Sequence, residues 1–294
     1  MRRLTIARIS NVPIVWLLPL IVVVGLFFVY PVFEVLRFSL TDASLLRERY
    51  SYTLQTFVRV LTDPRLGNQV RVTAIFVIGS VAFQLLLGLL IAMAVRRGGT
   101  RRLLGSSLIR VIVLSAWIIP GVAAGIVWRF IFSESGHGFL TTMLRGWGLP
   151  VVPWLSSIDM ALVSVTIANI WRGTAFSMIL QYAGLQSIPD EYYEAAAVDG
   201  ASGFQSFWYI TLPQLRTVIL INTILITIFT LNTFDLVLAL TGGGPGRATE
   251  VLSLFTYNAV FRGFDLGAGS VLAVLMLFIS LTMTIFYVRL LPKG

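Results

Sequence analysis

The sequence predicts an all-α integral membrane protein with six transmembrane helices. Hydrophobic residues make up 57% of the 294 positions and charged residues 12%, whereas about a quarter of a soluble domain is usually charged. The apolar residues also gather in runs of the roughly 20 residues that a helix needs to cross a bilayer. These runs lie at about 12–33, 72–95, 107–131, 160–182, 217–241 and 268–290.

The first run resembles a secretory signal peptide, because Arg2, Arg3 and Arg8 precede it. A signal peptide has a shorter apolar core and ends at a small-x-small cleavage site. The run from Val12 to about Phe33 is of spanning length, and no such site follows it. We therefore expect a retained first helix.

Arginine clusters predict the orientation. Six spans place both termini on one side, and cytoplasmic segments are usually rich in Lys and Arg. The basic residues on that side are Arg2, Arg3, Arg8, Arg96, Arg97, Arg101, Arg102, Arg289 and Lys293. Both termini are therefore predicted to be cytoplasmic. The segment 40–71, predicted to lie outside, opposes this pattern with Arg47, Arg49, Arg59, Arg65 and Arg71.

Composition excludes several classes of function. The chain has no Cys and one His, His137, so disulfides, thiolate catalysis and a Cys- or His-based metal site are not expected. A phosphate-binding Walker A loop needs a lysine, and the only lysine is Lys293. The net charge of +9 comes mostly from Arg beside apolar runs, which indicates lipid headgroups rather than nucleic acid. We predict no catalytic residue, metal or cofactor in this chain.

Small residues recur at helical spacing within the spans. Ser80, Gln84, Gly88 and Ala92 follow each other at every fourth position, and the pair Gly121 and Gly125 lies beside Pro120. Such stripes allow helix backbones to approach closely. We expect them at helix–helix contacts.

A polar segment near residue 190 predicts a helical hairpin on the membrane surface. The segment 187–190 reads Ser-Ile-Pro-Asp, a possible capping pair with Pro in the first turn. We expect a short helix to about Val198 and a left-handed C-cap at Gly200. A second short helix, 204–209, would lead to Pro213 and the next span.

The order of residues in this hairpin carries a family resemblance. It reads Glu-Ala-Ala-Ala-Val-Asp-Gly-Ala at 194–201 and Ile-Thr-Leu-Pro at 210–213. This resembles the EAA loop, here about 186–213, of permease subunits in binding-protein-dependent ATP-binding-cassette (ABC) importers. An ordinary amphipathic juxtamembrane helix would explain the aromatic residues nearby but not this order. The resemblance implies docking into a cleft of a separate ATPase, with Glu194 as principal contact among Glu194, Ala195, Ala196, Asp199, Gly200 and Ala201.

The fifth apolar run carries a polar stripe, formed by Asn222, Thr223, Thr227, Thr230, Asn232, Thr233 and Asp235. Polar side chains in a span usually face a bundle interior or an aqueous path. The stripe could therefore bind a sugar, with Phe229 and Phe234 nearby. Equally, Thr often bonds the carbonyls of its own helix, and Asn joins helices. For Asp235 we expect an ion pair with Arg129 or Arg172.

Two further motifs resemble the MalF-type permease of carbohydrate importers. These are Leu-Thr-Gly-Gly-Gly-Pro at 240–245, and Trp-Arg-Gly at 171–173 ahead of Gly-Leu-Gln-Ser-Ile-Pro at 184–189. The resemblance implies a substrate site within the membrane, formed by Arg172, Gly173, Phe176, Phe229, Thr230 and Thr233. The chain departs from the maltose pattern, because Arg172 replaces an apolar residue and Thr230 and Thr233 replace amides. The substrate therefore need not be maltose.

Together the resemblances imply a MetI/MalF-like type I ABC importer permease fold in the bacterial inner membrane. Residues 1–71 would form a first helix and peripheral segment, and 72–294 the core transmembrane domain. The implied partners are a second permease, two ATPase subunits that hold ATP and Mg²⁺, and an extracytoplasmic solute-binding protein. A maltose- or trehalose-like sugar is the expected substrate. The alternatives are glycerol 3-phosphate or, in another class, an ion-coupled secondary transporter, for which Asp235 alone is a poor fit.

Overall fold

The computed structural model of the chain describes residues 13–100 and 104–291. Of the arginines used to predict orientation, Arg2, Arg3, Arg8, Arg101 and Arg102 lie outside these ranges, as does Lys293. Regular structure in the described ranges is helical, apart from two isolated β-bridges. The elements are α2 (Pro13–Val24), η1 (Gly25–Val29), α3 (Tyr30–Ser39), α4 (Gln55–Leu61), α5 (Leu66–Thr100), α6 (Leu104–Ile118), α7 (Gly121–Ile131), α8 (Phe139–Gly146), α9 (Ile158–Gln186), α10 (Glu191–Val198), α11 (Gly203–Ser206), η2 (Phe207–Thr211), α12 (Leu212–Leu231), α13 (Asp235–Leu240), α14 (Leu252–Phe261) and α15 (Leu266–Arg289).

Length and composition make five helices candidates for crossing a membrane, or six if one bent pair counts as a span. The five are Trp16–Ser39, Leu66–Arg97, Ile158–Gln186, Gly203–Leu231 and Leu266–Arg289. Each of these helices overlaps one of the apolar runs, and only the third run, 107–131, has no single helix among the five. The predicted all-α membrane fold is therefore confirmed.

The third apolar run, expected as one span over 107–131, is instead two helices. Leu108–Ile118 and Gly121–Ile131 meet at an angle of 105°. The break lies at Pro120, whose backbone has φ −55° and ψ 142°. Proline clashes with a helical residue before it, and a mean hydropathy cannot register this. The prediction of one continuous helix was wrong.

The fifth run, expected as a span over 217–241, also differs from the prediction. It begins earlier, because α11, η2 and α12 form one continuous apolar helix from Gly203 to Leu231. It then stops at Asn232, and a separate short helix, α13, starts at Asp235. The polar residues Asn232, Thr233 and Asp235 therefore lie at an interruption between two helices and not inside one continuous helix.

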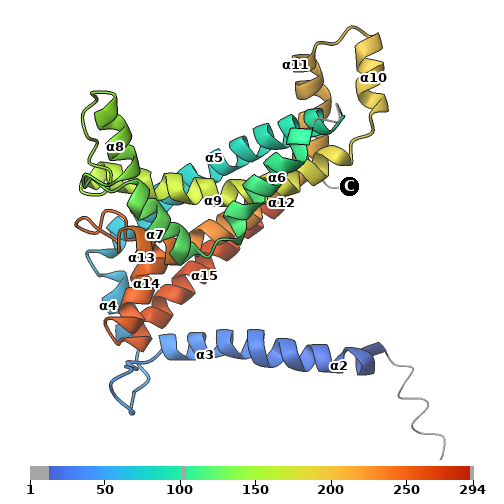
Figure 1. Ribbon diagram of the computed structural model, residues 1–294. Helices are drawn as coiled ribbons and strands as arrows, with labels where there is room; N and C mark the ends of the chain where they lie inside the picture. Colours follow the sequence, from blue (N-terminus) through green and yellow to red (C-terminus); the bar gives the residue numbers. More distant parts are fainter. Residues whose placement is uncertain (1–12, 101–103, 292–294) are drawn as a thin grey trace, which may run out of the picture. The chain divides into compact units, whose positions relative to one another are not determined.

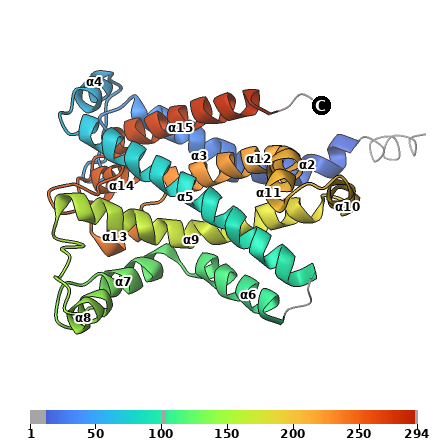
Figure 2. The same ribbon diagram turned by 90° about the horizontal axis from the view of Figure 1, so that it is seen from above.

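The chain divides into two compact units, Met1–Asp63 with Thr256–Leu275 and Pro64–Phe255 with Met276–Gly294. In the second unit, α9 contacts α5, α6 and α12, and α13 packs on α7 (Figure 1, Figure 2). The stripes of small residues lie at these contacts, as predicted. Ser80, Gln84 and Ala92 on α5 are buried, and a Cβ at Gly88 would stand 2.6 Å from the Cβ of Ser177 on α9.

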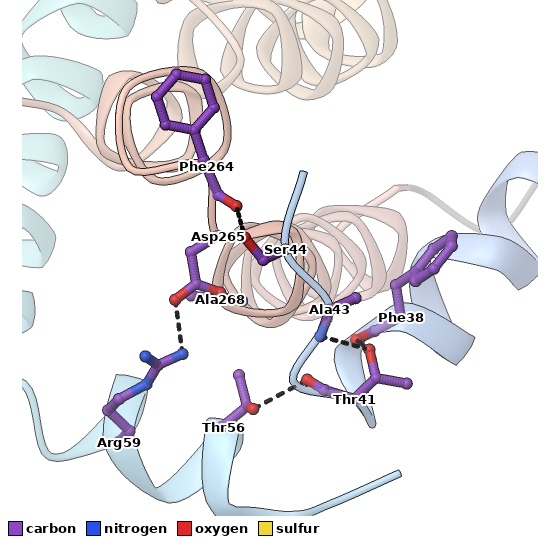
Figure 3. A network of polar contacts seen from close by, with 9 residues as sticks. All are labelled: Phe38, Thr41, Ala43, Ser44, Thr56, Arg59, Phe264, Asp265 and Ala268. Atoms are coloured by element: carbon purple, nitrogen blue, oxygen red, sulfur yellow. Dashed lines mark hydrogen bonds and ion pairs between the residues drawn. The ribbon is translucent and has the colours of Figure 1, made fainter. Parts of the chain in front are cut away.

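The first unit joins the start of the chain to the α14–α15 turn through polar contacts (Figure 3). The Ser44 hydroxyl donates to the carbonyl of Phe264 at 2.8 Å, and Arg59 pairs with Asp265 at 2.7 Å. The Thr56 hydroxyl donates to the Thr41 carbonyl at 2.9 Å. Arg59, one of the arginines that opposed the predicted orientation, is thus neutralised by a partner distant in sequence.

Candidate functional site

The polar segment after α9 forms the predicted helical hairpin, made of α10, a turn and α11 (Figure 1). Helix α10 ends at Val198, as predicted. Gly200 has φ +77°, and the N–H groups of Gly200 and Ala201 donate to the carbonyls of Ala197 and Ala196 at 3.1 and 2.8 Å. This pair of bonds is a Schellman C-cap, which requires a left-handed residue at Gly200.

The start of each arm differs from the prediction. Ser187 does not cap α10 but is the C-cap residue of α9, and its hydroxyl donates back to the Gly184 carbonyl at 2.8 Å. The second arm begins at Gly203, where Ser202 and Gln205 form a reciprocal capping box. It continues through the short π-helix η2 into α12. The expected separate helix over 204–209 is therefore the beginning of the next span.

The EAA-type residues lie on an exposed helix. Helix α10 buries none of its residues. Glu194, Ala195, Asp199 and Gly200 are exposed, whereas Ala196 and Ala201 are half-buried. The first turn carries the carboxylates of Glu191 and Glu194. An exposed acidic helix with small side chains offers a surface on which a basic partner can pack closely.

A second feature of the same unit is a cavity of about 360 Å³ at the two interrupted helices. Its wall comes from α5, α6, α9, α12 and α13 and from the break before α13. The lining residues are Gln84, Trp117, Asn169, Arg172, Gly173, Ile226, Phe229, Thr230, Asn232, Thr233, Phe234 and Asp235. Of the six residues predicted to bind substrate, five line this cavity.

The sixth, Phe176, is not among the lining residues but packs against two of them, Trp117 and Phe229. Its ring centroid lies 5.0 Å from that of Trp117 and 5.3 Å from that of Phe229. The ring centroids of Trp117 and Phe229 lie 5.6 Å apart. The guanidinium carbon of Arg172 lies over the Trp117 ring, 5.8 Å from its centroid. The aromatic faces of Trp117 and Phe229 thus form a wall on which an apolar sugar face can stack.

One part of the polar stripe of the fifth run forms structural hydrogen bonds, and another part lines the cavity. The hydroxyls of Thr223 and Thr233 donate to Ile219 and Phe229 of their own helix, at 2.7 and 2.9 Å. Asn222 joins α12 to α9 by donating to Ser177 at 2.7 Å. Only the part of the stripe from Thr230 onward lines the cavity.

Two polar atoms of the cavity residues lack a partner within the described part of the chain. They are Nδ2 of Asn169 and Nε of Arg172, both on α9. Asn169 is only 4% exposed, and a buried polar group without a partner costs roughly 1–3 kcal/mol. Both atoms are closed to solvent, so a hydrophilic molecule in the cavity could bond them only after the side chains move.

The expected ion pair of Asp235 is absent. Arg172 shares the cavity with Asp235, but no ion pair joins Asp235 to Arg129 or Arg172 in the described structure. The Asp235 carboxylate accepts the N–H of Leu236 at 2.9 Å and adjoins Gly121. It therefore lies at the start of both α13 and α7, where helix N-termini stabilise a negative charge without a basic side chain.

Sequence reasoning did not assign Gln84, Trp117 and Asn169 to this site. Gln84 was expected only at a helix contact, and it does bond the Asn169 carbonyl at 3.0 Å across α5 and α9. Asn169 and Arg172 are three positions apart, so a shared face of one helix was the signal available. In residues 13–100 and 104–291, no three His, Asp or Glu side chains converge as metal ligands would.

The chain is similar to known transport proteins. The family model described as "Binding-protein-dependent transport system inner membrane component" matches residues 84–293. The trehalose/maltose transport system permease protein MalF of Thermococcus litoralis is 36% identical, over 93% of this chain and 91% of that protein. The sn-glycerol-3-phosphate transport system permease protein UgpA of Brucella abortus is 31% identical, over 96% and 94%.

Among solved structures, a bacterial ABC transporter involved in the import of the acidic polysaccharide alginate has the same fold. Its chain superposes with a TM-score of 0.81 and 20% identity, over 96% of both chains. The matches confirm the predicted family and fold class. This chain belongs to the family of inner membrane components of binding-protein-dependent transport systems.

Proposed function

We propose that this chain is the permease subunit of an ATP-driven sugar importer. Its α10–α11 hairpin receives the motion of a separate ATPase at the cytoplasmic face, and its cavity holds the substrate between two access states. The observation that carries the proposal is the presence of both parts in one unit, an exposed acidic helix and a cavity lined by aromatic and hydrogen-bonding groups.

The cavity favours a neutral sugar. Its volume of about 360 Å³ is at the lower end of ordinary small-molecule sites. Arg172 and Asp235 oppose each other in charge, and the remaining polar lining groups are amides and hydroxyls. The similarity to the trehalose/maltose permease supports a disaccharide. Glycerol 3-phosphate is the second candidate, supported by the positive charge of Arg172 in the cavity lining and by the similarity to UgpA.

The partners follow from the same reading. A second permease completes the path, two ATPase subunits hold ATP and Mg²⁺, and a solute-binding protein delivers the sugar outside the membrane. The crystal structure of a bacterial alginate ABC transporter in complex with an alginate pentasaccharide-bound periplasmic protein supports this arrangement. In the proposed orientation both termini are cytoplasmic.

Reversing the charge of Glu194 tests the docking part of the proposal. In proteoliposomes containing the assembled transporter, Glu194→Lys should abolish most of the ATPase stimulation caused by sugar-loaded binding protein, because Lys repels a basic cleft. Glu48→Lys is the control for charge reversal, since Glu48 is also exposed but lies outside the hairpin. Normal stimulation in the Glu194 variant would contradict docking through this residue.

The energy source is tested separately. Uptake into vesicles should require ATP and should persist when ion gradients are collapsed by ionophores. Uptake driven by a proton gradient without ATP would instead identify an ion-coupled secondary transporter.

A further inference from the structure

Arg96, near the end of α5, holds the α10 arm of the hairpin with one guanidinium group. Its Nη2 lies 2.9 Å from the Asp190 carboxylate and 3.4 Å from the Ile188 carbonyl, and its Nη1 lies 3.1 Å from the hydroxyl of Tyr193. The guanidinium carbon also lies 4.8 Å from the centre of the Tyr193 ring. Arg96 is thus bonded to three residues at the start of the hairpin.

The same contacts reach the second arm through Tyr193. The Tyr193 hydroxyl lies 2.9 Å from the hydroxyl of Thr211, which belongs to the π-helix η2 that leads into α12. The Thr211 hydroxyl in turn lies 3.4 Å from the carbonyl of Ser206 in α11. Arg96 and Tyr193 therefore connect α5 to both arms.

Such a connection is needed because of the chain topology. The hairpin is covalently continuous with α9 at one end and with α12 at the other. Helix α5 has no chain connection to the hairpin, so its link depends on side chains alone. An apolar cluster that includes Ala92 of α5, Ile188 and Leu215 lies beneath, with Tyr193 packed against it. Apolar packing holds α5 against the hairpin but is not directional. The hydrogen bonds of Arg96 fix the orientation of the hairpin relative to α5.

Helix α5 also reaches the cavity. Gln84 lies twelve positions before Arg96, which is about 18 Å along an α-helix. Gln84 lines the cavity and bonds α9, and Gln181 of α9 donates to the Leu85 carbonyl at 3.1 Å. A displacement of the hairpin that is passed to Arg96 therefore moves one wall of the cavity.

We propose that Arg96 is a positioning residue for energy coupling. It fastens both arms of the hairpin to α5, so that α5 carries the motion of the hairpin to the cavity. This inference rests on the proposed docking of the hairpin to an ATPase. A guanidinium presents donors in a planar fork and can bond Asp190 and Tyr193 together, which the single ammonium of Lys cannot reproduce.

The test measures coupling in the assembled transporter in proteoliposomes, as sugar taken up per ATP hydrolysed and as ATPase stimulation by sugar-loaded binding protein. Arg96→Gln should lower both by about tenfold, within the usual range of coupling between sites. Arg96→Lys should restore part of the loss. Arg97→Gln, at the exposed neighbouring position, is the matched control and should behave as the parent protein.

A structural role alone would lower the yield or melting temperature of the complex and leave uptake per ATP unchanged, and that result would overturn the inference. If Arg96→Gln does not assemble, Tyr193→Phe decides, because it removes only the hydroxyl that reaches the second arm. Unchanged coupling in Tyr193→Phe would then overturn the inference, and reduced coupling would support it.

The Glu194→Lys variant separates failure of this inference from failure of the proposed function. Loss of stimulation in Glu194→Lys with normal coupling in Arg96→Gln overturns the role of Arg96 only. Normal stimulation in Glu194→Lys overturns the docking proposal itself.

Discussion

The contact between α5 and α9 leads to a quantitative prediction at Gly88. A Cβ at this position would lie 2.6 Å from the Cβ of Ser177 and 3.0 Å from the backbone nitrogen of Met178. Ordinary van der Waals contact begins at 3.4 Å, so Gly88→Ala forces the helices apart by close to an ångström. The obstructing atoms belong to the backbone or are attached to it, and no rotamer change can relieve the clash.

The magnitude follows from two opposing effects. Overpacking of this kind costs about 1–3 kcal/mol, whereas Ala in place of Gly favours a helix by about 1 kcal/mol. Gly67 on the same helix isolates the second effect, because nothing lies within 4 Å of its added Cβ. Gly67→Ala should therefore leave stability unchanged or raise it. Gly88→Ala should be less stable than Gly67→Ala by about 1–3 kcal/mol.

Thermal unfolding of the purified chain in detergent, followed by tryptophan fluorescence, provides the measurement. The melting temperature of Gly88→Ala should be lower than that of Gly67→Ala by at least about 2 °C. Sugar affinity should also fall, since Gly88 lies one helical turn from Gln84 in the cavity wall. Equal melting temperatures for the two variants would refute the close approach of α5 and α9.

Two further predictions concern the cavity and the segment before α9. Replacing Thr230 and Thr233 by Leu should reduce sugar uptake about tenfold or more, because two hydrogen-bonding groups of about 0.5–1.5 kcal/mol each are removed. Thr223→Leu, outside the cavity, is the control. Unchanged uptake in the double variant would show that Thr230 and Thr233 do not line the substrate path. Burial raises the pKa of Glu134, but hydrogen bonds from Ser156 and from the backbone of Leu155 and Ser156 outweigh it and hold the pKa below its ordinary value. The ionised carboxylate therefore stabilises the fold above the ordinary carboxyl pKa and loses this effect as the pH falls through the lowered pKa. Melting temperatures between pH 7 and pH 3 should show a fall on acidification that is smaller in Glu134→Gln, and identical pH profiles would contradict the role of this carboxylate.

The sequence predicted what depends on local pattern. Apolar runs located the long helices, and the small-residue stripe of α5 located the face of this helix that packs on another helix. The loop motif located the hairpin, and the end of its first arm at Gly200 followed from the need for a left-handed residue. These features are encoded in consecutive residues or in helical spacing, so one sequence is sufficient to find them.

The interruptions of two helices were not predicted. The stretches around Pro120 and around residues 232–234 were each counted as part of one apolar run. An average of hydropathy over a window does not distinguish a straight span from a bent one. Cavity residues on other helices, such as Trp117 and Asn169, were missed for a related reason. Their roles depend on which helices meet, and this is decided by tertiary packing.

The charge of Asp235 shows a different limit. The cost of an isolated charge in a membrane led to the expectation of a basic partner. The structure instead places this carboxylate at the start of two helices. The starts of α7 and α13 depend on the two helix interruptions, and these interruptions were not predicted.

The close packing of α7 on α13 at Gly121 and Gly125 has a wider consequence. Any side chain at these glycines would collide with Asp235, or with Leu236 and Ala239, so the two half-helices are confined to a single rigid wedge. Each cut in a helix leaves backbone amides and carbonyls that hydrocarbon cannot satisfy. In the proposed importer, the wedge would therefore fix through the main chain where a hydrophilic substrate is tolerated, and a change of substrate during evolution would require new side chains around an unchanged frame.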